Sequence, residues 1–147
     1  RMNEVKIFFN NSFEININKS NLKKFSSNVF NLNNFFEFNL SIIFVEKAFL
    51  RNMKKKYFKK DLFTDVIAFN LNEKNESTDG EIYLSLEIIS ENARIYGVQF
   101  EQEIKRVVCH GILHLIGYND DTIEKKNEMS LIENESLKLF KDISIIC

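Results

Sequence analysis

The chain has 147 residues, with 20 Lys and Arg against 21 Asp and Glu, so its formal net charge is −1. A length of about 150 residues predicts one domain with its own core, and the near-zero charge argues against a protein that coats nucleic acid by bulk charge. The sequence has no apolar run near the roughly 18 residues of a membrane span, and no glycine-rich loop for a nucleotide cofactor.

The amino-terminal segment predicts a pair of strands and then a helix. Apolar and polar residues alternate over residues 5–9 and again over residues 13–17, with a turn at Asn10 and Asn11 between them. A short helix is expected to begin near Ser20 and to end in the asparagine-rich residues 31–34.

The middle of the chain predicts strands on either side of a helix. Residues 36–45 first alternate and then become almost continuously apolar, as an inner strand does, and residues 46–57 follow with helical spacing. Residues 65–71 and 80–85 predict two further strands, separated by a polar loop at residues 72–79.

The last third of the chain predicts two helices. Residues 100–116 form the longest apolar segment, which we expect to be a central helix buried on most sides. An amphipathic helix is expected over residues 122–140, with these residues facing inward: Met129, Ile132, Ser136, Leu137 and Phe140.

These elements predict an α/β (α+β) fold with a mixed sheet of about four to five strands packed with about four to five helices. The central buried helix carries an HxxxH pattern. We expect one domain over residues 2–147, because Met2 has the appearance of a natural start and the pattern of elements shows no linker or second domain.

The only two histidines of the chain, His110 and His114, stand four residues apart in this central helix. The spacing places both imidazoles on one helical face about one turn apart, as two ligands of one metal ion require. Core filling is the simpler explanation for an isolated pair of histidines. Gly117, a residue type that ends helices, and Asp120 favour a metal site of the pattern HxxxHxxGxxD.

Three neighbouring residues compete for the third ligand position: Asn119, Asp120 and Asp121. Asp121 and Glu124 form a D-x-x-E pair that predicts a cap on the last helix, which leaves Asp120 to turn toward the histidines. Two imidazoles and a carboxylate leave one tetrahedral position for a water molecule, as in catalytic zinc sites. We predict one Zn²⁺ per chain at the two histidines and Asp120, with iron, manganese or nickel less favoured.

Two residues of the same helix bear on the chemistry. Metalloproteases of the HExxH type carry a glutamate where this chain has Gly111, so peptide hydrolysis by that route is disfavoured. Glu103 lies seven residues before His110 on the same face, and it could orient His110 or act as a base through water. A surface ion pair of Glu103 with Lys105 or Arg106 is an equal alternative.

The overall charge balance hides a basic segment at residues 51–60, RNMKKKYFKK, just before TDVIAF. Its cations would attract phosphates and its rings would stack on bases, although the solvated face of a helix is the plainer explanation. The candidate RNA contacts come from this segment and from the start of the next strand: Arg51, Lys56, Tyr57, Lys59, Lys60, Thr64 and Asp65.

The two cysteines, Cys109 and Cys147, indicate no disulfide framework, so a reducing cytoplasm is the simplest location. Cys109 points about 100° away from its neighbour His110 on a helix. We therefore expect Cys109 to be a small core residue and not a metal ligand.

The residues around the histidines resemble the signature of the YbeY family of rRNA-maturation endoribonucleases. HGILHLIGYND at residues 110–120 is similar to the family's HGxLHLxGYDH, with Asp120 in place of a third histidine. TDVIAF at residues 64–69 and GEIYLS at residues 80–85 are similar to the family's TDVLSF and GDIxIS strands. The resemblance covers about residues 46–140.

The resemblance implies a zinc ion held by the two helix histidines and a third ligand, with metal-bound water as the attacking group. It implies a metal-dependent, single-strand-specific endoribonuclease that matures the 3′ end of small-subunit rRNA. The implied partners are precursor rRNA or single-stranded RNA, and the small ribosomal subunit with its proteins. No membrane and no nucleotide cofactor are expected.

Two alternatives stand beside this function. The family commonly carries an arginine at the position of Phe58, and its absence favours a ribosome-assembly binding factor with a structural metal and little or no cleavage. The other alternative is a metal hydrolase of another substrate, such as a peptide or a small phosphoester. Gly111 speaks against peptides, and the missing glycine-rich loop speaks against nucleotides.

Overall fold

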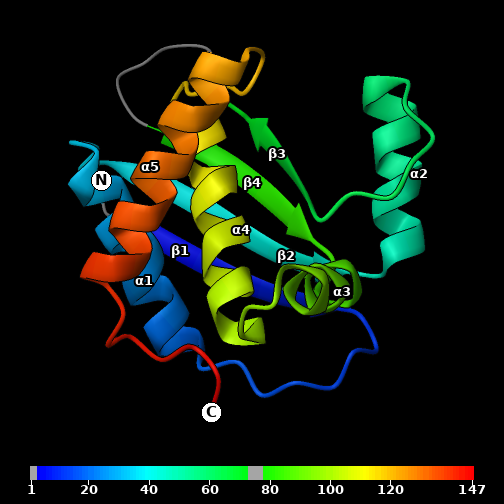
Figure 1. Ribbon diagram of the computed structural model, residues 1–147, viewed down its shortest axis with the longest axis horizontal. Coiled ribbons are helices and arrows are strands. Elements are labelled where there is room, and N and C mark those ends of the chain that lie inside the picture. Colours follow the sequence, from blue (N-terminus) through cyan, green and yellow to red (C-terminus); the bar gives the residue numbers. More distant parts are fainter. Residues whose placement is uncertain (1–2, 73–77) are drawn as a thin grey trace.

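The structure is a computed structural model that describes residues 3–72 and 78–147. Along the chain its elements are β1 (Glu4–Asn10), α1 (Lys19–Leu32), β2 (Phe38–Val45), α2 (Lys47–Phe58), β3 (Val66–Asn70), β4 (Thr78–Leu84), α3 (Leu86–Tyr96), α4 (Phe100–Leu115) and α5 (Ile123–Leu139). The predicted α+β fold with a mixed sheet and a central helix is confirmed (Figure 1).

The four described strands form one sheet in the order β1-β2-β4-β3. β2 pairs in parallel with β1 and with β4, whereas β3 pairs antiparallel with β4 at the sheet's edge. The register aligns Ile7, Ile42 and Ile82 in one row across the sheet, and all three are buried. This apolar row faces the helices, because residues in register on neighbouring strands share a face.

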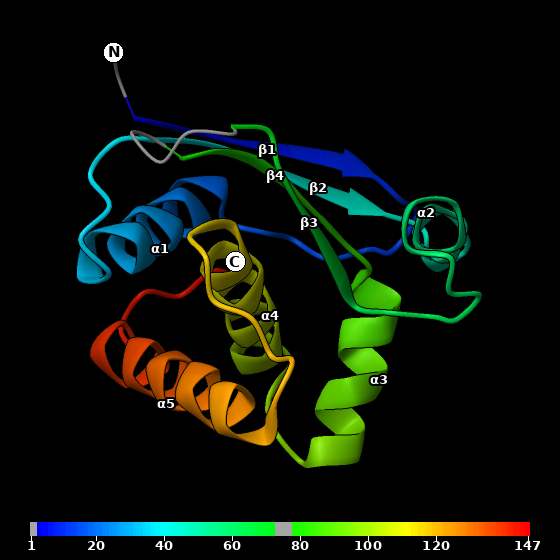
Figure 2. The same ribbon diagram turned by 90° about the horizontal axis from the view of Figure 1, so that it is seen from above.

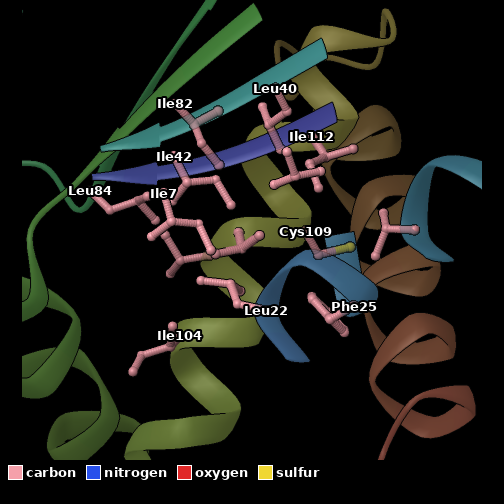
Figure 3. Close-up of a cluster of buried hydrophobic side chains, with 14 of the residues drawn as sticks. Ile7, Leu22, Phe25, Leu40, Ile42, Ile82, Leu84, Ile104, Cys109 and Ile112 are labelled. Carbon is pink, nitrogen blue, oxygen red and sulfur yellow. The ribbon is translucent and has the colours of Figure 1, made fainter. Parts of the chain in front are cut away.

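Four helices gather on one side of the sheet, and α2 stands at its end (Figures 1 and 2). α4 is sandwiched by α1, α3 and α5 and buries most of its length, as the sequence predicted. Figure 3 shows the resulting core, where Ile42 and Ile82 of the sheet face Leu22 of α1 and Ile112 of α4.

A second, smaller cluster lies on the opposite face of the sheet. Leu50 is the buried residue that α2 contributes, and it packs with Ile43 and Val45 of β2 and Ile67 of β3. Because β2 is apolar on both faces at this end, it can hold α4 and α2 at once. This second cluster places the basic helix beside β3.

Two glycines let α4 approach the sheet closely. A Cβ atom at Gly111 would lie 3.0 Å from Ile82 Cγ2, so a larger residue would push the helix away from the sheet. A Cβ atom at Gly80 of β4 would lie 2.7 Å from Leu115 Cδ2 and 3.1 Å from the carbonyl oxygen of Phe69. Both contacts fix the height of the histidine helix above the strands.

Several predicted boundaries differ from the structure. The expected second strand at residues 13–17 is wrong: only Ile17 forms an isolated bridge, to Ile146, because β1 finds its partner in β2. β4 begins at Thr78, so the predicted loop ends earlier, and its residues 73–77 lie outside the described residues. α3 was missed, although Ser85 caps it and Gly97 ends it with φ +68°.

The residues after α5 are tied to α4 by two charged side chains. Lys105, 1% exposed, donates from Nζ to the carbonyl oxygens of Phe140 (2.8 Å) and Ile143 (3.0 Å). Glu101 Oε2 accepts from the backbone N–H groups of Ile145 (2.7 Å) and Ile146 (3.0 Å). We call residues 140–147 the carboxyl-terminal strap. These hydrogen bonds hold the strap against α4.

In the part of the chain that the structure describes, no helix is long and apolar enough to cross a membrane.

Candidate metal centre

The two histidines sit where α4 meets the start of the loop to α5. Both imidazoles are about 30% exposed, so they reach solvent from a helix that is otherwise buried. Asn70 at the end of β3 donates from Nδ2 to the carbonyl oxygen of Leu115 at 2.9 Å, which anchors the helix end to the sheet.

The turn after α4 brings Asp120 back over the histidines. Tyr118 donates its backbone N–H to the carbonyl oxygen of Leu113 at 3.0 Å, and Gly117 adopts φ +112°, a value that favours glycine. Asp121 does not cap α5 as predicted, because Thr122 is the cap and its Oγ1 accepts from the N–H of Lys125.

The three predicted ligand residues converge. His110 Nε2 lies 3.0 Å from His114 Nε2, and Asp120 Oδ2 lies 3.7 Å from the first nitrogen and 3.9 Å from the second. Metal–ligand bonds of about 2.0–2.1 Å at tetrahedral angles put ligand atoms roughly 3.3 Å apart. The donor set therefore fits one ion of zinc's size and ligand preference.

Glu133 of α5 fixes the orientation of His110. Its Oε2 lies 2.6 Å from His110 Nδ1, and because a carboxylate accepts, Nδ1 carries the proton. The lone pair of His110 is then on Nε2, the nitrogen that faces His114 and Asp120. Glu133 was not predicted from the sequence, because only the crossing of α5 over α4 brings it to His110.

The two histidines have opposite pKa shifts. Burial lowers the pKa of His110, but the hydrogen bond and charge of Glu133, with the charges of Asp120 and Asp65, outweigh burial and raise it. Burial, followed by the charge of His110, lowers the pKa of His114. The site is thus a negative environment around His110, as a cation requires.

Glu103, the candidate partner of His110, lies elsewhere. It is 3% exposed, and its Oε1 is 3.9 Å from Arg106 Nε, so the ion-pair alternative describes it better, although the pair is not on the surface. Arg106 also reaches Glu133 Oε1 at 3.4 Å. Burial is the largest cause that raises the pKa of Glu103. Arg106 therefore joins Glu103 to the carboxylate that holds His110.

A cavity of about 490 Å³ opens beside the three candidate ligand residues, between α4, β3 and the end of α2. Its described lining residues are Lys54, Phe58, Thr64, Asp65, Val66, Ile67, Ala68, Asn70, His110, His114, Leu115 and Asp120. Two predicted RNA contacts, Thr64 and Asp65, are among them. Five others are outside this lining: Arg51, Lys56, Tyr57, Lys59 and Lys60.

Asp65 is held at the back of the cavity. Its Oδ2 accepts from Asn92 Nδ2 of α3 at 3.3 Å, and burial raises its pKa although the charge of His110 opposes this. Arg51 is engaged outside the cavity lining, where its Nε lies 2.8 Å from Asp61 Oδ1 and its guanidinium lies over the ring of Phe63. These contacts hold the segment between α2 and β3.

Comparisons with known proteins relate this chain to one family. The family model described as "Endoribonuclease YbeY" matches residues 7–141. A protein named "Endoribonuclease YbeY" from Amoebophilus asiaticus is 45% identical over 91 residues, which span 62% of this chain and 62% of that protein. A protein of the same name from Christiangramia forsetii is 31% identical over 137 residues, 93% of this chain and 94% of its own length.

A solved structure has a similar fold. The solution structure of a Thermotoga maritima protein superposes with a TM-score of 0.62 at 26% identity, and the match covers 94% of this chain and 92% of that one.

Proposed function

The chain belongs to the YbeY family of endoribonucleases, and on that premise we propose that it is a single-strand-specific, metal-dependent endoribonuclease of rRNA processing. The proposal covers one domain over residues 2–147, with precursor rRNA as substrate and the small ribosomal subunit and its proteins as partners. The reaction would be maturation of the 3′ end of small-subunit rRNA in the cytoplasm.

One observation carries the proposal: three donor atoms, two imidazole nitrogens and a carboxylate oxygen, meet at an open cavity. We propose Zn²⁺, one per chain, held by His110, His114 and Asp120, because closed structural sites use a fourth protein ligand and this set leaves room for water. When bound, the ion would polarise a phosphoryl oxygen and activate a water molecule.

The protein side chains supply position and protonation state. Glu133 keeps the proton of His110 on Nδ1, so that Nε2 stays available as a ligand. Thr64 and Asp65 line the same cavity as the three proposed ligands, where an RNA strand would pass. Burial raises the pKa of both Asp65 and Glu103, but Asp65 lines the cavity and Glu103 does not, so Asp65 is the better candidate for proton transfer near the scissile phosphate.

Metal analysis combined with RNA cleavage tests the proposal. We expect purified protein to contain one zinc per chain and to cleave single-stranded precursor rRNA, whereas His114→Ala and Asp120→Ala should lose metal and fall to the cleavage level of the chelated wild type. Asp121→Ala is the matched control, because this exposed neighbour lies outside the ligand group. Full metal content and full cleavage in His114→Ala would contradict the mechanism.

The assembly-factor alternative has one specific observation in its favour. Phe58 occupies the cavity wall, and the described lining contains no arginine that could stabilise a pentavalent phosphorane by bidentate contacts. Metal-replete protein that binds ribosomal particles but cleaves no better than its chelated control would support that alternative.

A further inference from the structure

Lys54 and Phe58 of α2 stand apart from the rest of the basic segment. They lie four residues apart and therefore on one face of the helix, and both line the cavity of the metal centre. Among the described lining residues, Lys54 is the one lysine or arginine and Phe58 is the one phenylalanine, tyrosine or tryptophan.

Lys54 differs in exposure from its neighbours. It is partly buried, whereas Lys55, Lys56, Lys59 and Lys60 are exposed. Its Nζ lies 4.8 Å from the centroid of the Phe58 ring, so the ammonium is kept at the rim of the cavity.

A phosphate can enter the cavity only if a cation offsets the negative charge of its lining. Asp65 and Asp120 both line it, and their carboxylates repel an RNA backbone. A metal ion at the histidines would offset the charge of Asp120, which leaves Lys54 as the protein cation of the described lining. A lysine ammonium binds phosphate as a point charge and needs no fixed orientation.

Phe58 presents an apolar ring to solvent. The residue is 41% exposed although it lies beside an aromatic cluster, and its ring centroid is 6.0 Å from that of Phe69, at an interplanar angle of 31°. Phe69 contacts Tyr57 and Tyr83 edge-on at 5.3 Å and 5.9 Å, so it supports Phe58 from behind. A supported, partly exposed ring at a cavity mouth is suited to base stacking.

The end of α2 is rigidly placed for this role. Lys59 ends the helix in the left-handed region with φ +59°, and its N–H donates to the carbonyl oxygen of Lys55. The Arg51–Asp61 ion pair then ties the following residues back to the helix. Phe58 is the last residue of α2, and the turn that follows it is held in place by these two contacts.

We propose that Lys54 binds a backbone phosphate of the RNA strand and that Phe58 stacks on the adjacent base, so that together they hold the strand at the metal cavity. This inference rests on the proposed function. It assigns substrate binding to two residues that lie in the cavity, in place of the exposed lysines around them. Stacking on Phe58 releases Lys54 from the ring and frees its ammonium for the phosphate.

Salt-dependent binding tests Lys54. Binding of a fluorescein-labelled, mixed-sequence single-stranded RNA to chelated protein would be measured by anisotropy over a range of salt concentrations. Lys54→Ala should raise Kd by about fivefold and reduce the slope of log K against log salt by about 0.7, the value for one phosphate on a single strand. Lys55→Ala, on the same helix but outside the cavity, is the matched control and should change the slope by less than half as much.

Substitutions at Phe58 separate stacking from apolar packing. Phe58→Leu keeps an apolar side chain against Phe69 but removes the ring, and it should raise Kd by about fivefold or more, whereas Phe58→Tyr should bind as wild type. A 2-aminopurine in the RNA should be quenched by wild type and by Phe58→Tyr, and not by Phe58→Leu. Phe49→Leu, an exposed ring of α2 outside the cavity, is the control.

The outcomes separate this inference from the proposed function. Wild type that neither binds the RNA nor, when metal-loaded, cleaves it would overturn the proposed function. Wild type that binds and cleaves, with Lys54→Ala equal to Lys55→Ala and Phe58→Leu equal to wild type, would overturn this inference alone. Thermal unfolding of each variant confirms that the protein compared is folded.

Discussion

A single hydrogen bond, between His110 Nδ1 and Glu133 Oε2, decides which nitrogen of His110 faces the cavity. The same carboxylate receives Arg106, and Arg106 in turn pairs with Glu103. Both glutamates are less than a tenth exposed, whereas the Arg106 side chain between them is 34% exposed. The carboxylate that holds His110 is thus one that solvent screens weakly.

Replacement of Glu133 tests this orientation. We expect Glu133→Gln to weaken zinc binding by about 10- to 100-fold, the usual cost of losing a carboxylate behind a ligand histidine. Competition with a chromophoric chelator measures the affinity, and nitrogen NMR shifts of His110 report its tautomer. Glu135→Gln, exposed two residues later on α5, is the control. Equal affinities for the two variants would contradict the role of Glu133.

The ligand residues were predictable from the sequence because they are local. His110 and His114 fall within one helical turn, where spacing fixes their relation. Asp120 lies in the next loop among three neighbouring candidates, and the Asp121 cap that favoured it is not formed. Glu133 was not predictable in this way, since its contact depends on how α5 crosses α4. Glu103 shares the histidine face in sequence, but it is two turns distant and takes the nearer Arg106.

The contact between α4 and β4 sets the position of the histidine helix. Leu115 closes this contact at the last residue of α4, over a glycine of β4 that leaves no room for a Cβ atom. Since His114 precedes Leu115, any change in this packing moves a metal ligand.

Gly80→Ala tests the close approach. We expect the free energy of unfolding to fall by about 1–2 kcal/mol, because the new Cβ overpacks against buried Leu115. Urea unfolding measures this change. In a Leu115→Ala background the cost of Gly80→Ala should become smaller, since the clashing methyl groups are gone and only the 3.1 Å approach to the carbonyl oxygen of Phe69 remains. Additive effects in this double-mutant cycle would show that Leu115 is not the obstacle.

At the scale of helices and strands, the sequence predicted an element correctly where the spacing of apolar residues within that segment determines its structure. The sequence predicted a helix where α1 lies and a helix buried on most sides where α4 lies. Alternation over residues 13–17 misled, because those side chains pack against the helical core without a neighbouring strand. The parallel pairing of β1 with β2 has no local signal, since it depends on the crossover through α1.

The carboxyl-terminal strap connects parts of the molecule that are distant in sequence. Asn18 donates its N–H to the carbonyl oxygen of Ile145, and Cys147 donates to that of Asn16. Glu101 and Lys105 of α4 bind the same strap from the other side. The first helix, the central helix and the last residues are thereby joined at one end of the domain.

Acid should weaken this strap. Although burial raises the pKa of Glu101, the donors of Ile146, Ser144 and Ile145 favour its carboxylate and lower the pKa below the usual 4.5. Because the pKa of Glu101 is lower in the folded than in the unfolded protein, its carboxylate stabilises the fold above pH 4.5. This contribution is lost as the pH falls through the pKa of the folded protein.

Glu101→Gln measures that contribution. At pH 7 we expect the free energy of unfolding of the variant to be about 1–2 kcal/mol lower than that of wild type. This difference should shrink as the pH falls below the usual glutamate pKa. Urea unfolding across a pH series gives both quantities. Glu128→Gln, exposed on α5, is the control. If the difference in unfolding free energy between the variant and wild type stayed constant from neutral to acidic pH, the stabilising role of the Glu101 carboxylate would be contradicted.

The local spacing of the metal ligands has a consequence for how the protein folds. Only nine residues separate His110 from Asp120, so gathering the donors around an ion closes a short loop, and the entropy lost in closing a loop grows with its length. We expect zinc to be captured by a chain in which the parallel sheet, with its distant partners, has not yet formed. The ion would then act as an early folding nucleus as well as a cofactor.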